Sequence, residues 1–179
     1  MTRYIGLLRA VNVGGVTLRM DDLRRTLDAG GIQEVQTLLQ SGNVVFRDER
    51  RFAPELERYL QTELLPRIGI ETEVFVRAAA EWHDLVRKNP LPERAREDPG
   101  RLLVSVLKRA PTPSAWAELR SASPGPETIR EGSRHAYIYY PEGSGRSKLT
   151  QARIDRVLGI AGTSRNWNTV LKLDGLASR

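Results

Sequence analysis

The chain has 179 residues, a formal net charge of +6 and no cysteine. Its length suits one large domain or two small ones that fold without cross-links, and the lack of cysteine excludes disulfides, thiolate zinc sites, iron–sulfur clusters and thiol nucleophiles. No apolar run approaches the roughly 20 residues of a membrane-spanning helix, and the N-terminus has no signal-peptide pattern, so we expect a soluble, cytoplasmic protein.

The first 77 residues predict the element order β-α-β-β-α-β. An apolar run at residues 4–10 ends in the turn-rich segment 12–15, which is typical of a buried strand followed by a loop. Leucines at helical spacing predict the two helices. Short β-rich runs between turn residues predict the other strands. The predicted elements are a strand at 4–10, a helix at 20–27, hairpin strands at 34–39 and 43–47, a helix at 52–64 and a strand at 72–76.

Residues 78–100 predict a helix and a linker. Trp82, Leu85 and Val86 share one helical face, and the Pro-rich, charged stretch 89–100 has the composition of a linker. We therefore expect this segment to connect two units.

Residues 101–179 predict a second unit with a shortened element order, β-α-β-β-α, and a C-terminal helix. The predicted elements are a strand at 102–107, a helix at 113–121, hairpin strands at 127–131 and 135–140, and helices at 149–158 and 166–176. A final strand is not predicted, because Trp167, Val170 and Leu171 fall at helical spacing. The fold class is thus α+β, a ferredoxin-like split βαβ unit followed by a second, truncated ferredoxin-like unit.

The excess of basic residues is compatible with several classes of anionic partner and does not select one. Lys and Arg number 28 against 22 Asp and Glu, a balance that attracts nucleic acid, acidic metabolites or anionic surfaces. The arginines are scattered among acids, as in segment 21–25, which is the pattern of solvated helix faces.

A glycine-rich loop at residues 143–148 precedes a predicted helix. A helix N-terminus favours an anion, so Ser147 and Lys148 are candidates for holding a phosphate. The spacing is not that of a Walker motif, and Ser147 is equally explained as a helix cap.

A second polar cluster, residues 163–169, opens the predicted last helix. Arg165, Asn166 and Asn168 could recognise a phosphate, a carboxylate or a base edge. The alternative is capping by Thr163 or Ser164, with a core tryptophan beside them.

Two loops in the first half complete the candidate set. Arg9 ends a predicted central strand, where a charge needs a partner or a functional cavity. Asn12, Gly14 and Gly15 follow it in the turn-rich segment. In the predicted hairpin, Ser41 and Asn43 are also typical turn residues.

The sequence predicts no catalytic constellation, no metal site and no cofactor. Its two histidines, His83 and His135, lack metal spacing and lie in ordinary helix and strand contexts. Whether the protein is an enzyme therefore stays open.

Three phrases carry a family resemblance: residues 9–15 (RAVNVGG), 39–46 (LQSGNVVF) and 163–170 (TSRNWNTV). Together they resemble the bacterial family of unknown function DUF1697, over nearly the whole chain. Ala10 stands where the pattern has glycine, and Ser164 where a small apolar residue is common. The resemblance implies a pair of ferredoxin-like units and a cytosolic bacterial origin, and it assigns no catalyst, cofactor or substrate.

The leading functional hypothesis is a protein whose polar loops converge around an anionic, phosphate-bearing small molecule. The candidate ligand-binding residues are Arg9, Asn12, Gly14, Gly15, Ser41, Asn43, Ser147, Lys148, Arg165, Asn166 and Asn168. One alternative is a nucleic-acid-binding module, in which Tyr137, Tyr139 and Tyr140 would stack on bases. A structural or interaction protein, or an enzyme, is the other alternative.

Overall fold

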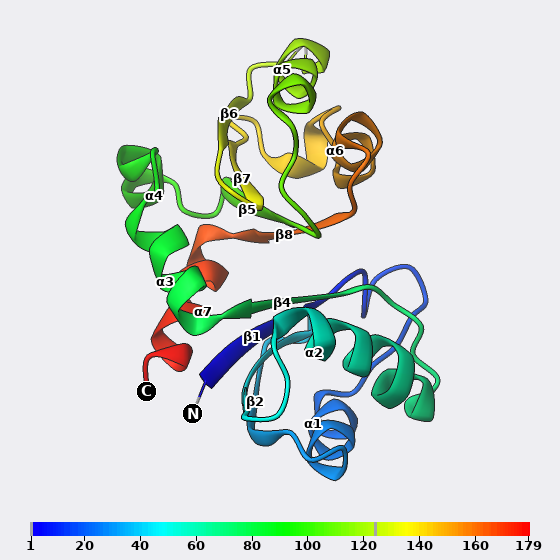
Figure 1. Ribbon diagram of the computed structural model, residues 1–179. Helices are drawn as coiled ribbons and strands as arrows, with labels where there is room; N and C mark the ends of the chain where they lie inside the picture. Colours follow the sequence, from blue (N-terminus) through cyan, green and yellow to red (C-terminus); the bar gives the residue numbers. More distant parts are fainter. Residues whose placement is uncertain (1, 124) are drawn as a thin grey trace. The chain divides into compact units, whose positions relative to one another are not determined.

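In the computed structural model, which describes residues 2–123 and 125–179, the chain divides into two compact units. Unit 1 comprises the residues up to Asp84 together with Lys172–Arg179, and unit 2 comprises Leu85–Leu171. The described residues form two four-stranded antiparallel sheets and seven α-helices (Figure 1). The prediction of a mixed α+β protein is confirmed.

The sheet of unit 1 has the strand order β2-β3-β1-β4. Its strands are β1 (Thr2–Leu8), β2 (Gln33–Leu38), β3 (Asn43–Asp48) and β4 (Val74–Ala78). β1 pairs antiparallel with both β3 and β4, so Gly6 lies between Val44 and Val76. A Cβ atom at Gly6 would approach Val44 Cγ2 to 2.9 Å, so glycine lets the helix-covered face pack closely.

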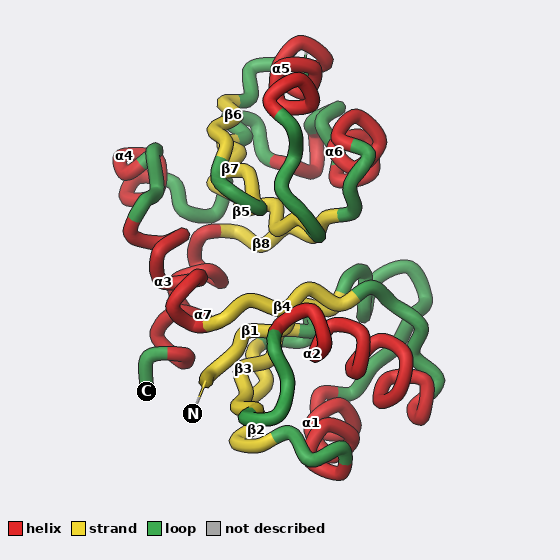
Figure 2. The backbone as a smooth tube through the Cα atoms, in the orientation of Figure 1, coloured by secondary structure: helices red, strands yellow, loops and turns green. Residues whose placement is uncertain are grey.

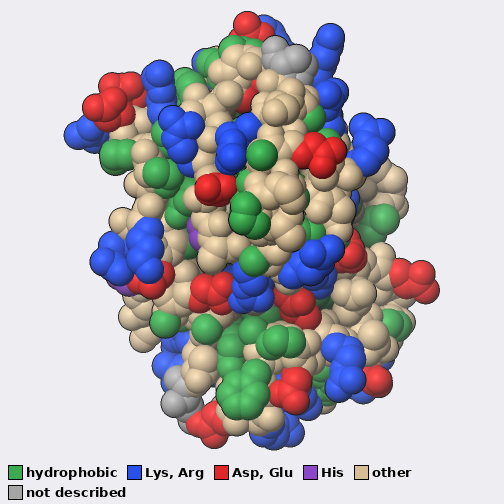
Figure 3. Space-filling view, turned by 45° about the horizontal axis from the view of Figure 1, so that its top comes forward, with side chains coloured by type: hydrophobic (Ala, Val, Ile, Leu, Met, Phe, Trp, Pro, Cys, Tyr) green, Lys and Arg blue, Asp and Glu red, His purple; other side chains and the backbone are tan. Residues whose placement is uncertain are grey.

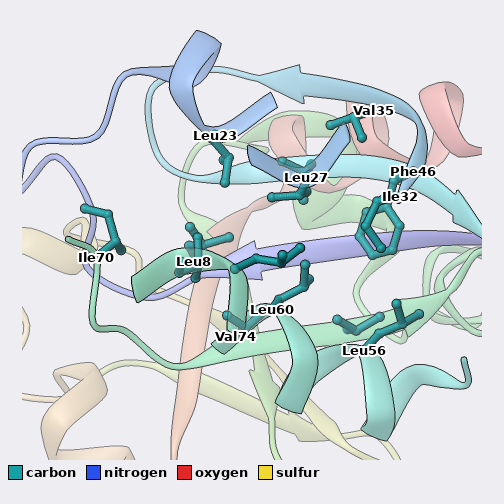
Figure 4. Packing of buried hydrophobic residues seen from close by; sticks show 14 of the residues in the cluster. Leu8, Leu23, Leu27, Ile32, Val35, Phe46, Leu56, Leu60, Ile70 and Val74 are labelled. Atoms are coloured by element: carbon teal, nitrogen blue, oxygen red, sulfur yellow. The ribbon is translucent and has the colours of Figure 1, made fainter. Parts of the chain in front are cut away.

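Two helical segments cover one face of the unit 1 sheet (Figure 2). They are α1 (Met20–Ala29) and α2 (Ala53–Tyr59), and α2 continues as a π-helix (Leu60–Leu64) and a 3-10 helix (Leu65–Ile68). Leu23 and Leu27 of α1 belong to the same buried cluster as Leu56 and Leu60 (Figure 4). Each such buried leucine contributes about 1.5–3 kcal/mol relative to an exposed one.

The sheet of unit 2 has the equivalent order, β6-β7-β5-β8. Its strands are β5 (Leu102–Leu107), β6 (Thr128–Glu131), β7 (His135–Tyr139) and β8 (Gly162–Asn166). The helices α5 (Pro113–Ala122) and α6 (Gln151–Leu158) pack on one face, where Trp116 and Ile154 are buried against Ile138.

The remaining helices are α3 (Ala79–Arg87), α4 (Pro92–Glu97) and α7 (Trp167–Ala177). Within unit 1, Arg3 of β1 donates a hydrogen bond to the carbonyl of Leu176 in α7 at 3.2 Å. In the part of the chain that the structure describes, no helix is long and apolar enough to cross a membrane.

The structure corrects two sequence predictions. Unit 2 is not truncated, because β8 pairs with β5 from Gly162 beside Leu107 to Asn166 beside Leu103. The predicted linker contains α4, which begins at Pro92, a residue that suits the first turn of a helix.

Candidate anion-binding groove

The strongest candidate site is a groove beside β6, an edge strand of the unit 2 sheet. Two pockets, each of about 290 Å³, adjoin there because Glu127 lines both. We name them the Lys148 pocket and the Arg130 pocket. The Lys148 pocket is lined by Gly125, Pro126, Glu127, Glu142, Gly143, Arg146, Ser147, Lys148 and Leu149, and the Arg130 pocket by Arg120, Ser123, Glu127, Thr128, Ile129 and Arg130.

The glycine-rich loop after β7 forms one wall of the Lys148 pocket. Gly143 has a φ of +85°, a left-handed conformation that glycine adopts without steric cost. The amide of Arg146 donates to the carbonyl of Gly143 at 3.2 Å and closes a short 3-10 helix, Ser144–Arg146. Arg146 and Lys148 both remain exposed beside the pocket.

Ser147 links this loop to the start of β6. Its hydroxyl donates a hydrogen bond to Glu127 Oε1, and its oxygen accepts one from the amide of Leu149 at 2.9 Å. The Tyr140 hydroxyl donates to the carbonyl of Leu149 at 3.0 Å. Burial raises the pKa of Tyr140, and the nearby carboxylate of Glu127 raises it further.

The Arg130 pocket lies between the end of α5 and β6. Arg120 forms an exposed ion pair with Glu131 at 3.1 Å, and such pairs contribute at most about 1 kcal/mol. Arg130 donates one hydrogen bond to the carbonyl of Ile129 at 3.0 Å and has further guanidinium donors. The Ser123 hydroxyl is buried and has no hydrogen-bond partner among the residues that the structure describes.

The expected phosphate site at a helix N-terminus is wrong in its geometry. Helix α6 begins at Gln151, and Thr150 is its N-cap, accepting a hydrogen bond from the amide of Arg153 at 3.2 Å. Ser147 therefore neither caps the helix nor lies in its first turn. The candidates Ser147 and Lys148 instead belong to the pocket wall.

The basic excess of the chain belongs entirely to unit 2. Unit 2 has fifteen Lys and Arg against eight Asp and Glu, a formal charge of +7, whereas unit 1 has thirteen against fourteen and a charge of −1. On the face shown in Figure 3, basic side chains are mixed with acidic ones and do not merge into one block. The net charge of unit 2 thus favours anions.

In unit 1, the structure brings two of the predicted loops together. The Asn12 side chain donates hydrogen bonds to the carbonyls of Leu18, at 2.9 Å, and of Gln40, and it accepts one from the amide of Leu18 at 2.7 Å. These bonds tie the loop after β1 to the β2–β3 hairpin. Asn12 is therefore engaged in holding the loops.

The other polar residues of the two loops also have structural partners. The fully buried Asn43 side chain donates to the carbonyl of Leu38 at 2.9 Å and to the Ser41 hydroxyl at 2.8 Å. Gly14 and Gly15 are exposed with φ values of +61° and +97°, as a tight turn requires. The turn interpretation of Ser41 and Asn43 agrees with these bonds.

Arg9 has the partner that its position demanded. Its guanidinium lies 3.1 Å from the carboxylate of Glu73, and its amide donates to the carbonyl of the same residue at 3.0 Å. The Thr72 hydroxyl donates to the Arg9 carbonyl. These contacts join the end of β1 to the segment before β4.

Arg165 lies on β8, on the sheet face opposite α5 and α6. It pairs with Val104, whereas the neighbouring Ser164 donates to Gln151 of α6 at 2.5 Å on the helix-covered face. The Arg165 guanidinium donates to the Thr163 hydroxyl and the Ser164 carbonyl, each at 2.9 Å. Burial lowers the pKa of Arg165 to about 10, so its charge persists at neutral pH.

The cap of α7 is Asn166, and not Thr163 or Ser164. Asn166 Oδ1 accepts a hydrogen bond from the amide of Thr169 at 3.0 Å, and Trp167 is buried as a core residue. Asn168 is exposed on the first turn of α7. Arg165, Asn166 and Asn168 line neither the Lys148 pocket nor the Arg130 pocket.

Neither histidine lines the groove. His83 lies 3.3 Å from Asp174 in unit 1, and His135 packs edge-on against Tyr137. Among the described residues, no group of three or more His, Cys, Asp or Glu could hold a metal ion. The side chains of the groove suit binding through charge and hydrogen bonds.

Sequence reasoning missed the residues that complete the groove: Arg120, Ser123, Glu127 and Arg130. The last three precede or belong to a short edge strand, and the first lies on the preceding helix. The only signal in the sequence was the excess of basic over acidic residues after residue 100, which is apparent only when the limits of unit 2 are known.

Comparison with known proteins gives a family and a fold. A family model described as "Protein of unknown function (DUF1697)" matches residues 1–137. The conserved bacterial protein SP0830 from Streptococcus pneumoniae has a similar structure, with a TM-score of 0.72 and 20% sequence identity over 100% of this chain and 99% of that chain. None of the curated proteins matches the chain.

Proposed function

Because the chain belongs to the DUF1697 family, whose description assigns no activity, we propose a function from the geometry: the protein binds an anionic, phosphate-bearing small molecule in the groove beside β6. One observation carries this proposal. Two adjoining pockets share Glu127 and are lined by four cationic side chains, Arg120, Arg130, Arg146 and Lys148.

The cations suit a phosphate more than a structural ion-pair network. Arg146 and Lys148 are exposed on the glycine-rich loop after β7, where a bound phosphate would accept hydrogen bonds from both. The charge of +7 on unit 2 would also raise the local concentration of anions and their rate of association.

Binding of a nucleic acid is a second candidate, favoured by the charge of unit 2. The expected stacking platform is wrong, however, because Tyr137, Tyr139 and Tyr140 are all buried. Arg94 of α4 lies over the Tyr139 ring at 4.7 Å, and the Tyr137 hydroxyl donates to the carbonyl of Leu85 at 2.7 Å. Contacts to an oligonucleotide would thus rest on phosphates and not on base stacking.

We also propose that both units are ferredoxin-like. The order β-α-β-β-α-β, the two sheet orders and the placing of both helices on one face support this assignment. A low-identity structural match supports the overall fold of the chain.

A thermal-shift measurement tests the proposed function. The protein is heated with inorganic phosphate, 5′-AMP or a sugar phosphate, and with adenosine as the uncharged counterpart. A ligand at about one hundred times its Kd adds about 2.7 kcal/mol, which raises the Tm of a chain of this size by about 5 °C or more. We expect a shift with phosphate-bearing compounds and none with adenosine.

A double variant and its matched control assign the shift to the groove. Arg146→Ala with Lys148→Ala removes two cations of the Lys148 pocket and should abolish the shift. Arg109→Ala with Arg156→Ala removes two exposed cations of unit 2 outside both pockets and should preserve it. Equal loss in both variants would mean that general charge, not the groove, binds the anion.

A further inference from the structure

We propose that the groove recognises a ligand that carries two phosphate groups on one sugar, with a free hydroxyl next to one of them. This inference rests on the proposed function and specifies the substrate class of the same site. The chemistry is that of a phosphate–ribose–phosphate unit, which a nucleoside 3′,5′-bisphosphate and a short RNA share.

The cations of the groove form two pairs. Arg146 and Lys148 line the Lys148 pocket, and Arg120 and Arg130 line the Arg130 pocket. Each pocket, at about 290 Å³, has room for a phosphate group and its attached atoms. A ligand with a single phosphate would leave one pair of cations unused.

One serine that lines the Arg130 pocket has a hydroxyl that a ligand group could satisfy. The buried Ser123 hydroxyl lacks a hydrogen-bond partner in the described part of the chain, and a buried polar atom without a partner costs about 1–3 kcal/mol. The hydroxyl is enclosed in this conformation, so its side chain would have to rotate toward the pocket for a phosphate oxygen to accept the hydrogen bond. The exposed Arg120–Glu131 pair is weak enough for a phosphate to compete for Arg120.

Glu127 lines both pockets, and its carboxylate would repel a phosphate placed against it. A sugar hydroxyl, in contrast, can donate a hydrogen bond to it. The carboxylate already accepts one hydrogen bond from Ser147, and a carboxylate offers about four acceptor positions. Glu127 thus suits a free hydroxyl on the carbon next to a phosphate-bearing one, such as the ribose 2′-hydroxyl beside the 3′-phosphate of a 3′,5′-bisphosphate.

Isothermal titration calorimetry with three probes tests this inference: adenosine 3′,5′-bisphosphate, its 2′-deoxy counterpart and 5′-AMP. We expect the bisphosphate to bind at least tenfold tighter than 5′-AMP, and the deoxy compound to bind several-fold weaker than the ribose form. A bisphosphate no tighter than 5′-AMP would overturn the inference while leaving the proposed function in place. Failure of all three to bind would overturn both.

Variants of the groove test which residues bind the second phosphate and which bind the hydroxyl. Arg120→Ala with Arg130→Ala should remove the advantage of the bisphosphate over 5′-AMP, and the control Arg109→Ala with Arg156→Ala should keep it. Glu127→Gln should reduce the difference between ribose and deoxyribose, because the charged acceptor is lost. An unchanged advantage in Arg120→Ala with Arg130→Ala would contradict the two-pocket arrangement.

A last pair of probes distinguishes the source of the ligand. Hexa-adenylate RNA and DNA of the same sequence are titrated beside the bisphosphate. RNA that binds more than tenfold tighter than the bisphosphate, with DNA weaker, would indicate a polynucleotide as the source. RNA no tighter than the bisphosphate would indicate a free nucleotide. DNA equal to RNA would contradict the role of Glu127.

Discussion

The Ser147 hydroxyl donates a hydrogen bond to the carboxylate of Glu127 and so ties the loop after β7 to the segment before β6. This bond joins the two walls of the Lys148 pocket, which come from parts of the chain about twenty residues apart. It also directs the Glu127 carboxylate within the groove. This side-chain contact therefore helps to set the shape of the Lys148 pocket.

Replacing this hydroxyl should loosen the groove. We expect Ser147→Ala to lower the free energy of unfolding by about 1–2 kcal/mol, because Glu127 loses a donor and the loop loses its link. Urea denaturation measures the change. As a control, Ser121→Ala removes an exposed hydroxyl that bonds only within α5 and should cost less than about 0.5 kcal/mol. Equal effects would show that the Ser147 bond does not shape the loop.

Two glycines with the same backbone conformation should respond differently to alanine. Gly42 and Gly69 have φ values of +72° and +70°, but a Cβ at Gly42 would approach Val11 Cγ2 to 2.5 Å and Leu8 Cβ to 2.8 Å, whereas Gly69 has open space. We expect Gly69→Ala to cost about 1 kcal/mol from the left-handed conformation alone. Gly42→Ala should cost at least twice as much in the same denaturation assay, and a smaller cost than at Gly69 would contradict the packing.

Ala10 should gain stability from glycine. Its φ is +51°, a left-handed conformation that costs an alanine about 1–2 kcal/mol. We expect Ala10→Gly to raise the free energy of unfolding by up to about 1 kcal/mol, after the extra entropy of glycine in the unfolded chain. The same change at Ala152, exposed in α6, should lower it by about 0.5–1 kcal/mol. Destabilisation at both positions would contradict the Ala10 conformation.

Tyr137 should make the protein sensitive to alkali. Burial raises the pKa of Tyr137 from 10.0 to about 12, so its neutral form stabilises the fold below pH 10, and this contribution is lost as the pH rises from 10 to 12. The loss is on the order of 2 kcal/mol. We expect the stability of Tyr137→Phe to fall less than that of the wild type between pH 9 and 11.5, as measured by urea denaturation.

Two other groups have shifted pKa values, and both are common to the two proteins in the comparison. Burial lowers the pKa of Arg165 to about 10, which makes stability rise with pH above that value, since the unfolded chain then holds the extra proton. Tyr140, with its raised pKa, acts in the same direction as Tyr137. Parallel curves for the wild type and Tyr137→Phe would contradict the buried environment of Tyr137.

The sequence predicted most of the fold because apolar periodicity marks strands and helices that bury one face. It missed β8, whose residues 163–166 are all polar and whose position at the sheet edge leaves it paired with β5 alone. The departure at Ala10 corresponds to a left-handed residue. The glycine that the family pattern has at this position is therefore explained by the positive φ of the backbone there.

The site was less predictable than the fold. Ser147 and Lys148 were marked by the glycines around them, but Glu127 and Arg130 belong to an ordinary charged stretch of sequence. Only tertiary structure brings that stretch against the loop after β7. Asn12 and Asn43, in contrast, were predicted to bind a ligand, but their side chains bond to loop backbones. In the sequence, such structural asparagines look the same as ligand-binding ones.

The central claim is that a phosphate-bearing anion binds in the groove beside β6. An amide chemical-shift titration of the isotope-labelled protein with 5′-AMP tests it most directly, because each amide reports its own position. We expect shifts concentrated at residues 125–130 and 143–149, and we expect them to be absent in the variant Arg146→Ala with Lys148→Ala. Shifts confined to the unit 1 loops around Asn12 and Gly42, or no shifts at millimolar nucleotide, would contradict it.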